Sequence, residues 1–308
     1  MHLVSWILGQ VVSERLGGSL IDSFMGVVMA TDPFARCRKS EVIAFAMVAM
    51  FLVGCSSSSG SLAPTTSLAP ASAPTIAASP STVGSSWTYV AFGDSWPYGA
   101  HCNGCRPFPV LYADGLAAET GRRIDFVNLT TNGGTAQSLL KDIKSSKTIR
   151  DAVARADIVM IATGGNDLGP AFDASVAGTC GGADKLDCFR NVAETLRASF
   201  DGILTEIEGL RNGRPTAIRL VTGSNEFLAD PGLIEALGAD FGKTGGVAVT
   251  KMNRDMLCEV AAKRNAKCVD LGLALNGPDL LRPQDVNTQK AMQAVAGAIV
   301  ASGLDELR

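Results

Sequence analysis

Histidine is almost absent from this chain of 308 residues, which contains only His2 and His101. Zinc sites are built mainly from cysteine and histidine at characteristic spacings. The chain has a single Cys-x-x-Cys, at Cys102 and Cys105, with no second copy and no histidine pair to complete a tetrahedral site. We therefore expect no metal site, and no motif in the sequence calls for a cofactor.

An excess of charge of either sign is also absent. Lysine and arginine total 27 and aspartate and glutamate total 30, for a net charge of −3. Proteins that bind nucleic acids usually carry a basic surface, so the composition argues against a nucleic-acid partner. Hydrophobic residues make up 46% of the chain, which is long enough for one or two domains with a core.

The apolar run near the N-terminus, Val42 to Val53, is too short to span a bilayer comfortably. It follows the basic residues Arg36, Arg38 and Lys39, and this order of a charged flank and a short apolar run is typical of an export signal. The run closes with Leu52-Val53-Gly54-Cys55, which resembles a bacterial lipobox. That resemblance implies cleavage after Gly54 and a lipidated N-terminal Cys55.

We therefore expect an exported protein, anchored by lipid at Cys55 to the outer face of the cell membrane. A plain anchor helix or a signal without lipid remains the alternative. The residues before the basic flank fit no signal, so Met25 or Met29 is an alternative start of the protein.

Three regions follow from these patterns. Residues 1–54 form an N-terminal extension and signal peptide. Residues 55–86 are rich in serine, alanine, proline and threonine, and the stretch from Ser56 to Ser86 has no charge, so we expect a disordered tether. Residues 87–308 form the folded domain.

Strand and helix patterns alternate along this domain. The predicted strands are Thr88–Phe92, Ile124–Leu129, Ile158–Ala162, Ala217–Thr222 and Lys267–Leu271. The predicted helices are Pro109–Thr120, Gln137–Asp142, Ile149–Arg155, Phe189–Arg211, Val247–Asn265 and Gln284–Ser302. This alternation predicts an α/β fold whose parallel sheet carries helices on both faces.

Three of the predicted strands end in short polar motifs. The first ends in Gly93-Asp94-Ser95 and the second in a segment running from Asn128 to Gly133-Gly134. The third is followed by Gly164-Gly165-Asn166-Asp167. The carboxyl ends of parallel strands share one edge of a sheet, where such folds bind their ligands.

Together these motifs resemble the SGNH (GDSL-type) esterase family, over roughly Trp87 to the C-terminus. The resemblance implies a three-layer α/β/α, flavodoxin-like fold with a mainly five-stranded parallel sheet. It also implies that Ser95 is a nucleophile, and that an oxyanion is held by the N–H groups of Ser95 and Gly133 and the side-chain amide of Asn166. Gly134 is the alternative to Gly133, while we expect Asp94 and Asp167 to shape their loops.

The family's base is a histidine in Asp-x-x-His-Pro before the last helix. The matching stretch here is Asp279-Leu280-Leu281-Arg282-Pro283, in which Arg282 occupies the histidine position and Asp279 the position of its partner. A shifted alignment places Val286 there instead. Arginine cannot accept the serine proton, which needs a base within hydrogen-bond reach.

Three alternatives remain for the missing base. His101 follows Ser95 by six residues and is a substitute base or else a surface histidine. Asp279 or Asp285 could act through a water molecule. In the third alternative the site binds its ligand without turning it over.

The sequence thus predicts an exported SGNH-type hydrolase that cleaves carboxylic esters of small molecules or lipids through an acyl-enzyme on Ser95. We expect reduced activity, because the usual base is replaced, and a monomeric protein. The alternative is a non-catalytic envelope protein that binds acylated lipid or glycan.

Six cysteines in the folded domain form three close pairs, Cys102–Cys105, Cys180–Cys188 and Cys258–Cys268. In an exported protein these pairs predict local disulfides, although proximity does not fix the connectivity. Cys102 and Cys105 precede a predicted helix, as redox-active pairs do, so disulfide exchange is a further alternative.

Overall fold

The computed structural model describes residues 86–307. The predicted signal peptide, the lipobox with Cys55 and the linker up to residue 85 lie outside this part of the chain and stay predictions. Between residues 86 and 307, no helix combines the length and the apolar character needed to cross a bilayer.

Five parallel strands form one sheet, in the order β2-β1-β3-β4-β5. They are β1 (Trp87–Gly93), β2 (Ile124–Thr130), β3 (Ile158–Ala162), β4 (Ala217–Val221) and β5 (Lys267–Val269). This is the flavodoxin-like order of doubly wound sheets. The predicted fold is confirmed, and each strand lies within two residues of its predicted bounds.

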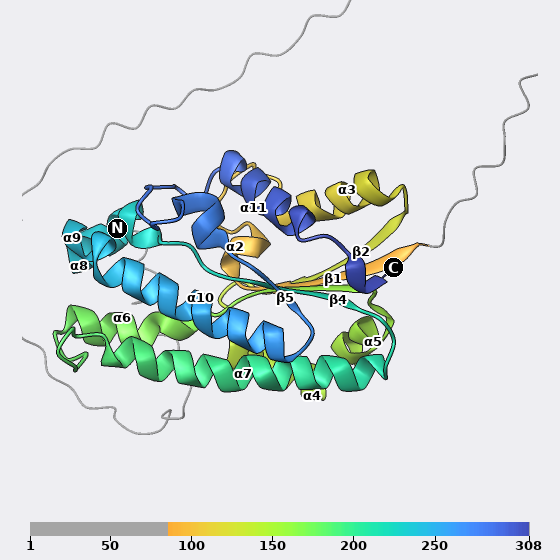
Figure 1. The fold of residues 1–308 in the computed structure, drawn as a ribbon, viewed down its shortest axis with the longest axis horizontal. Helices are drawn as coiled ribbons and strands as arrows, with labels where there is room; N and C mark the ends of the chain where they lie inside the picture. Colours follow the sequence, from red (N-terminus) through yellow and green to blue (C-terminus); the bar gives the residue numbers. More distant parts are fainter. Residues whose placement is uncertain (1–85, 308) are drawn as a thin grey trace, which may run out of the picture. The chain divides into compact units, whose positions relative to one another are not determined.

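Helices cover both faces of the sheet (Figure 1). One face carries α3 (Phe108–Thr120) and α11 (Gln289–Ala301), which pack against each other. The other face carries α4 (Ala136–Ser145), α5 (Lys147–Arg155), α7 (Asp187–Arg211) and α10 (Gly245–Lys263). The three layers predicted from the alternating pattern are therefore present.

The central strand β1 shows how the sequence fills both cores. Tyr89 and Ala91 belong to the cluster under α3 and α11, whereas Val90 and Phe92 belong to the cluster under α7. All four side chains are fully buried. Successive strand residues point to opposite faces, so a continuous apolar run is what a strand covered on both faces requires.

A third apolar cluster lies beyond the strands, among helices that the sequence analysis did not predict. These are α6 (Gly169–Val176), α8 (Pro231–Leu237) and α9 (Ala239–Lys243). Four aromatic rings make up its centre: Phe172, Phe189, Phe227 and Phe241. The cluster contains residues from the segments that follow β3 and β4, so it packs these two segments together.

The last helix starts later than predicted. We expected it to begin at Gln284, but α11 begins at Gln289. The Thr288 hydroxyl accepts a hydrogen bond from the Ala291 N–H at 3.2 Å, which fixes the N-terminus of the helix. Residues 284–288 are therefore a connecting segment, and this prediction was wrong because the cap outweighs the apolar pattern.

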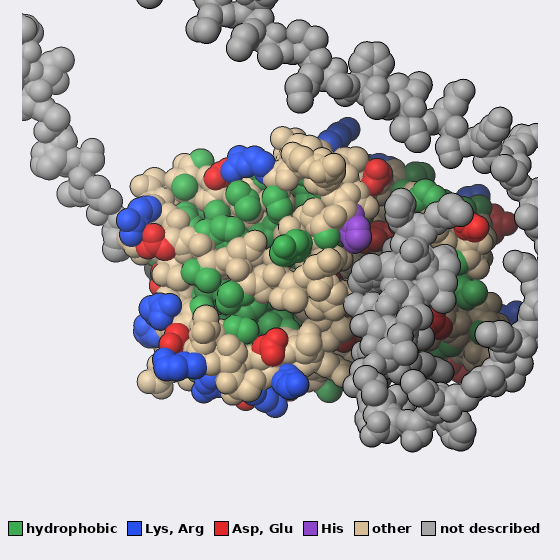
Figure 2. Space-filling view, turned by 180° about the vertical axis from the view of Figure 1, so that it is seen from behind, with side chains coloured by type: hydrophobic (Ala, Val, Ile, Leu, Met, Phe, Trp, Pro, Cys, Tyr) green, Lys and Arg blue, Asp and Glu red, His purple; other side chains and the backbone are tan. Residues whose placement is uncertain are grey.

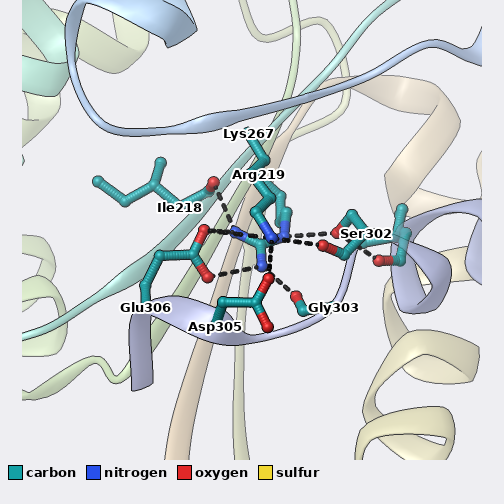
Figure 3. Close-up of polar contacts among 8 residues, drawn as sticks. Ile218, Arg219, Lys267, Ser302, Gly303, Asp305 and Glu306 are labelled. Atoms are coloured by element: carbon teal, nitrogen blue, oxygen red, sulfur yellow. Dashed lines mark hydrogen bonds and ion pairs between the residues drawn. The ribbon is translucent and has the colours of Figure 1, made fainter. Parts of the chain in front are cut away.

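A buried ion pair ties the end of the chain to the sheet (Figure 3). Arg219 on β4 is fully buried, and its guanidinium makes a two-pronged contact with Glu306, at 3.0 and 3.1 Å. The remaining N–H groups donate to the Ser302 hydroxyl, at 2.6 Å, and to the carbonyl oxygens of Ile218 and Gly303. The buried charge thus has partners for every donor, as burial of an arginine demands.

Disulfides join the three sequence-local cysteine pairs, with Cα–Cα distances of 5.3 Å for Cys102–Cys105 and 4.9 Å for both Cys180–Cys188 and Cys258–Cys268. Figure 2 shows lysine and arginine side chains interspersed with acidic ones on the face it presents. This agrees with the small net charge of the sequence.

Candidate active site

Ser95 is the first residue of the short helix α2 (Ser95–Tyr98), directly after β1. Gly93 precedes this turn, and a Cβ atom there would lie 2.7 Å from the Ala162 carbonyl oxygen, so only glycine fits. Asp94 caps the helix, because its carboxylate accepts a hydrogen bond from the Trp96 N–H at 3.2 Å. Ser95 itself is half-buried, at the carboxyl edge of the sheet.

The loop after β2 presents two glycines to the same edge. The Gly134 N–H donates to the Thr131 carbonyl at 2.9 Å, so it is already used within the turn. Gly133 has a φ of +79°, which favours glycine, and its N–H has no acceptor among residues 86–307. Of the two glycines, Gly133 is therefore the one with a free donor.

Asn166 connects the loops after β2 and β3. It begins the short helix η1 (Asn166–Leu168), and its side-chain amide donates to the Gly134 carbonyl at 2.8 Å. This bond uses one of the two amide hydrogens. The N–H of Ser95, like that of Gly133, has no acceptor in the described part of the chain. Three N–H donors at this edge are thus left over for a ligand.

Asp94 and Asp167 hold these loops in place. Asp167 accepts a hydrogen bond from the Ala136 N–H at 2.9 Å, and burial raises its pKa. Burial also raises the pKa of Asp94 to about 6, with the charge of Asp167 adding to the rise. Hydrogen bonds from the N–H groups of Trp96 and Gly165 oppose that rise without cancelling it. The loop-fixing roles expected for both residues agree with these contacts.

The stretch that matches the family's base motif is exposed. Asp279 accepts a hydrogen bond from the N–H of Leu281 at 3.2 Å, and both Asp279 and Arg282 face solvent. The Asn276 side chain holds the backbone here, donating to the Arg282 carbonyl at 2.9 Å. No hydrogen bond or ion pair joins Asp279 or Arg282 to Ser95.

Val286 instead lies next to the nucleophile segment. The indole N–H of Trp96, the residue after Ser95, donates to the Val286 carbonyl at 3.0 Å. The Val286 side chain is buried in the core under α11. Of the two alignments left open by the sequence, the one with Val286 at the base position is the one whose backbone contacts the Ser95 helix.

The other two candidate bases, His101 and Asp285, lie in exposed positions. His101 is exposed and makes no hydrogen bond to a residue between 86 and 307. Asp285 is also exposed, and its carboxylate accepts the Asn287 N–H at 2.9 Å. Neither contacts Ser95 in the structure.

Glu226 is the site residue to which sequence reasoning gave no role. It follows β4 at the same edge and begins the short helix η2 (Glu226–Leu228). Burial raises its pKa to about 7, and the negative charges of Asp94 and Asp230 contribute to the rise. Its position after a predicted strand was visible in the sequence, but its burial was not.

No group of histidine, cysteine, aspartate and glutamate residues within 86–307 is placed to hold a metal ion.

A cavity of about 560 Å³ lies beside the aromatic cluster, between α6, the Cys180 loop, α9 and the start of α10. Ser95 is not among its lining residues, so the nucleophile segment and this cavity are separate features.

A sequence model described as the GDSL-like lipase/acylhydrolase family matches residues 91–291. The structure is similar to a lipase from a goat rumen metagenome, with a TM-score of 0.57 and 19% identity over 72% of this chain and 100% of that one. A lipase from Streptomyces rimosus gives a TM-score of 0.48 and 16% identity over 70% and 100% of the two chains. A search of curated proteins finds no match.

Proposed function

Because the chain belongs to the GDSL-like lipase/acylhydrolase family, we propose that it hydrolyses carboxylic esters of small molecules or lipids through an acyl-enzyme on Ser95. One observation carries this proposal: the N–H groups of Ser95 and Gly133 and one hydrogen of the Asn166 amide are left without acceptors at the edge where Ser95 lies. Such unused donors are what a developing oxyanion requires.

In the proposed reaction, the Ser95 hydroxyl oxygen attacks the ester carbonyl carbon while a base takes its proton. The carbonyl π electrons move to oxygen, and the three N–H donors stabilise the resulting oxyanion. Collapse of this intermediate expels the alkoxide, which takes up a proton and leaves as the alcohol. Water then attacks the Ser95 ester in the same manner and releases the carboxylic acid.

The hydrogen bond between Asn166 and Gly134 prepares this arrangement before substrate binds. Removing one oxyanion-hole donor typically costs about 10²–10³-fold in kcat. General-base assistance is worth about 10²–10⁴-fold, and no imidazole within residues 86–307 is hydrogen-bonded to Ser95, so we expect wild-type activity to be weak. The lack of an imidazole partner for Ser95 within residues 86–307 also favours a second candidate, an envelope protein that binds acylated lipid or glycan without turnover.

Activity measurements with p-nitrophenyl esters, together with labelling by a fluorophosphonate probe, separate the two candidates. We expect Ser95→Ala to abolish both hydrolysis and labelling, and Asn166→Ala to lower kcat by about 10²–10³-fold. Ser224→Ala is a matched control, because this serine lies at the same edge after β4 and should leave both signals unchanged. Labelling of Ser95→Ala equal to that of wild type would remove Ser95 from the mechanism.

For the location of the protein, we propose export and a lipid anchor on Cys55, on the strength of the charged flank, the short apolar run and Leu52-Val53-Gly54-Cys55. Mass spectrometry of the mature N-terminus tests this directly. We expect a diacylated Cys55, and Cys55→Ser should leave the precursor uncleaved or the protein released. An unlipidated wild-type N-terminus would contradict the anchor.

A further inference from the structure

Glu226 is a carboxylate at the carboxyl edge of the sheet without a partner in the described part of the chain. Its side chain makes no hydrogen bond and no ion pair within residues 86–307, although it is half-buried. Other acidic residues near the strand ends are occupied: Asp94 accepts from Trp96, Asp167 from Ala136, and Asp230 from Leu233. Glu226 is half-buried and keeps its carboxylate unpaired, so this group is available to a ligand at the edge.

The segments that carry Ser95 and Glu226 leave the same edge of the sheet, with one loop between them. In the sheet, β3 lies between β1 and β4, so the loop after β3 separates the loops that carry Ser95 and Glu226. That loop contains Gly164 and Gly165, and a Cβ atom on Gly165 would lie 3.6 Å from an Asp94 carboxylate oxygen. The Asp94 carboxylate, next to Ser95 in the chain, therefore lies against the loop that separates Ser95 from Glu226.

The backbone on either side of Glu226 is held firmly. The Asn225 side-chain amide donates to the carbonyl oxygens of Gly242, at 2.9 Å, and Leu280, at 2.8 Å. The Asn225 N–H donates to the Asn276 side chain at 2.7 Å. Beside it, the Ser224 hydroxyl is buried without a partner. Glu226 thus projects from a rigid segment, as a group that must meet a substrate should.

The electrostatics agree with this geometry. The charged groups that act on Glu226 are Asp94, from the β1 loop, and Asp230, from the next turn of its own segment, and Asp167 acts in turn on Asp94. Burial is the main reason that the pKa of Glu226 rises to about 7, and these negative charges add to the rise. A base is most effective when its pKa is near the working pH.

We propose that Glu226 is the general base of the reaction, in place of the missing imidazole. Its carboxylate accepts the Ser95 proton, directly or through one water molecule, as the oxygen–carbon bond forms. The protonated acid returns that proton to the departing alkoxide, and the cycle repeats with water in the second half-reaction. This inference rests on the proposed ester hydrolysis by Ser95.

Kinetics of Glu226→Gln over a range of pH test the inference. In wild type, kcat should rise with pH through about 7 and then level off, because the ionised carboxylate is the active form. Glu226→Gln should lower kcat by about 10²–10⁴-fold, remove this rise and leave KM within about threefold. Glu226→Asp should retain part of the activity and its pH dependence. Glu235→Gln, an exposed glutamate on α8, is the matched control.

Circular dichroism should show that each variant is folded, and a fluorophosphonate should still label Ser95 slowly in Glu226→Gln. If Ser95→Ala abolishes hydrolysis while Glu226→Gln keeps the kcat and pH profile of Glu235→Gln, the inference is wrong and the proposed function stands. If wild-type hydrolysis is undetectable, or unaffected by Ser95→Ala, the proposed function and the inference both fail.

Discussion

The pair of Arg219 and Glu306 makes a quantitative prediction about stability. The Arg219 side chain is fully buried and that of Glu306 is 11% exposed. Glu306→Ala removes both contacts to the guanidinium, at 3.0 and 3.1 Å, and leaves a positive charge inside the protein. Breaking a buried pair by removing one partner costs about 3–5 kcal/mol. For a domain of this size, that free energy lowers Tm by about 6–20 °C.

The neighbouring pair of Lys267 and Asp305 supplies the control. Its two charges lie 3.1 Å apart, but the side chains are 35% and 73% exposed. Exposed pairs contribute about 0–1 kcal/mol, so Asp305→Ala should shift the urea midpoint only slightly. Urea unfolding followed by circular dichroism measures both variants. If Glu306→Ala destabilises the protein no more than Asp305→Ala does, burial does not govern this contact and the reasoning fails.

Replacing both members of the buried pair provides a second check. In the double variant Arg219→Met with Glu306→Leu, no charge is left in the core, and replacing a buried pair with apolar residues is often neutral or stabilising. We therefore expect the double variant to be more stable than Glu306→Ala alone. A double variant that is no more stable than Glu306→Ala would show that packing, and not charge, dominates this part of the core.

Three further predictions follow from the site. Val286→His should raise esterase kcat by about 10²-fold or more, and Arg282→His should add less, because the backbone of Val286 contacts the Ser95 helix; an equal gain from both would contradict this placement. Glu226→Gln should make the free energy of unfolding less dependent on pH. The pKa of Glu226 is about 7 in the folded protein and about 4.5 in the unfolded chain. The free energy of unfolding of wild type therefore falls by about 3 kcal/mol as the pH rises through this window. Urea titrations at pH 4.5 and 8 measure the difference. Replacing both Cys180 and Cys188 by serine should cost up to about 2–3 kcal/mol, measured by thermal unfolding of the variant and of wild type, and an unchanged Tm would show that this bond does not stabilise the fold.

The parts of the fold that depend on local patterns could be predicted from the sequence. A strand covered on both faces needs a continuous apolar run, and β3, Ile158–Ala162, was predicted with its observed bounds. The start of α11 could not be read in this way, because the Thr288 cap competes with an apolar pattern that extends further towards the N-terminus. Thr288 could be read from the sequence, but only the structure shows that it fixes the start of α11.

Features that depend on contacts between residues far apart in the sequence could not be predicted. The helices α6, α8 and α9 are short, and they are held by aromatic contacts between residues far apart in the chain, such as Phe172 and Phe227. Periodicity over so few residues is a weak signal. The sequence places Glu226 shortly after a predicted strand but does not reveal its raised pKa, because that pKa depends on burial and on Asp94, more than a hundred residues away.

The arrangement of the site explains how an oxyanion-binding edge can persist without the usual histidine. The loops after β1, β2 and β3 bind one another: Asn166 donates to the Gly134 carbonyl, the Gly165 N–H donates to Asp94, and the Ala136 N–H donates to Asp167. None of these contacts involves the segment before α11, where the family's histidine stands. Loss of that histidine therefore leaves the donors in place, and any base that reaches Ser95 can restore the proton transfer.

A base can act from two separate places, the loop after β4 with Glu226 and the position of Val286. A double variant that combines Glu226→Gln with Val286→His should thus be more active than Glu226→Gln alone, whereas no gain over Glu226→Gln would mean that a base at position 286 does not reach Ser95.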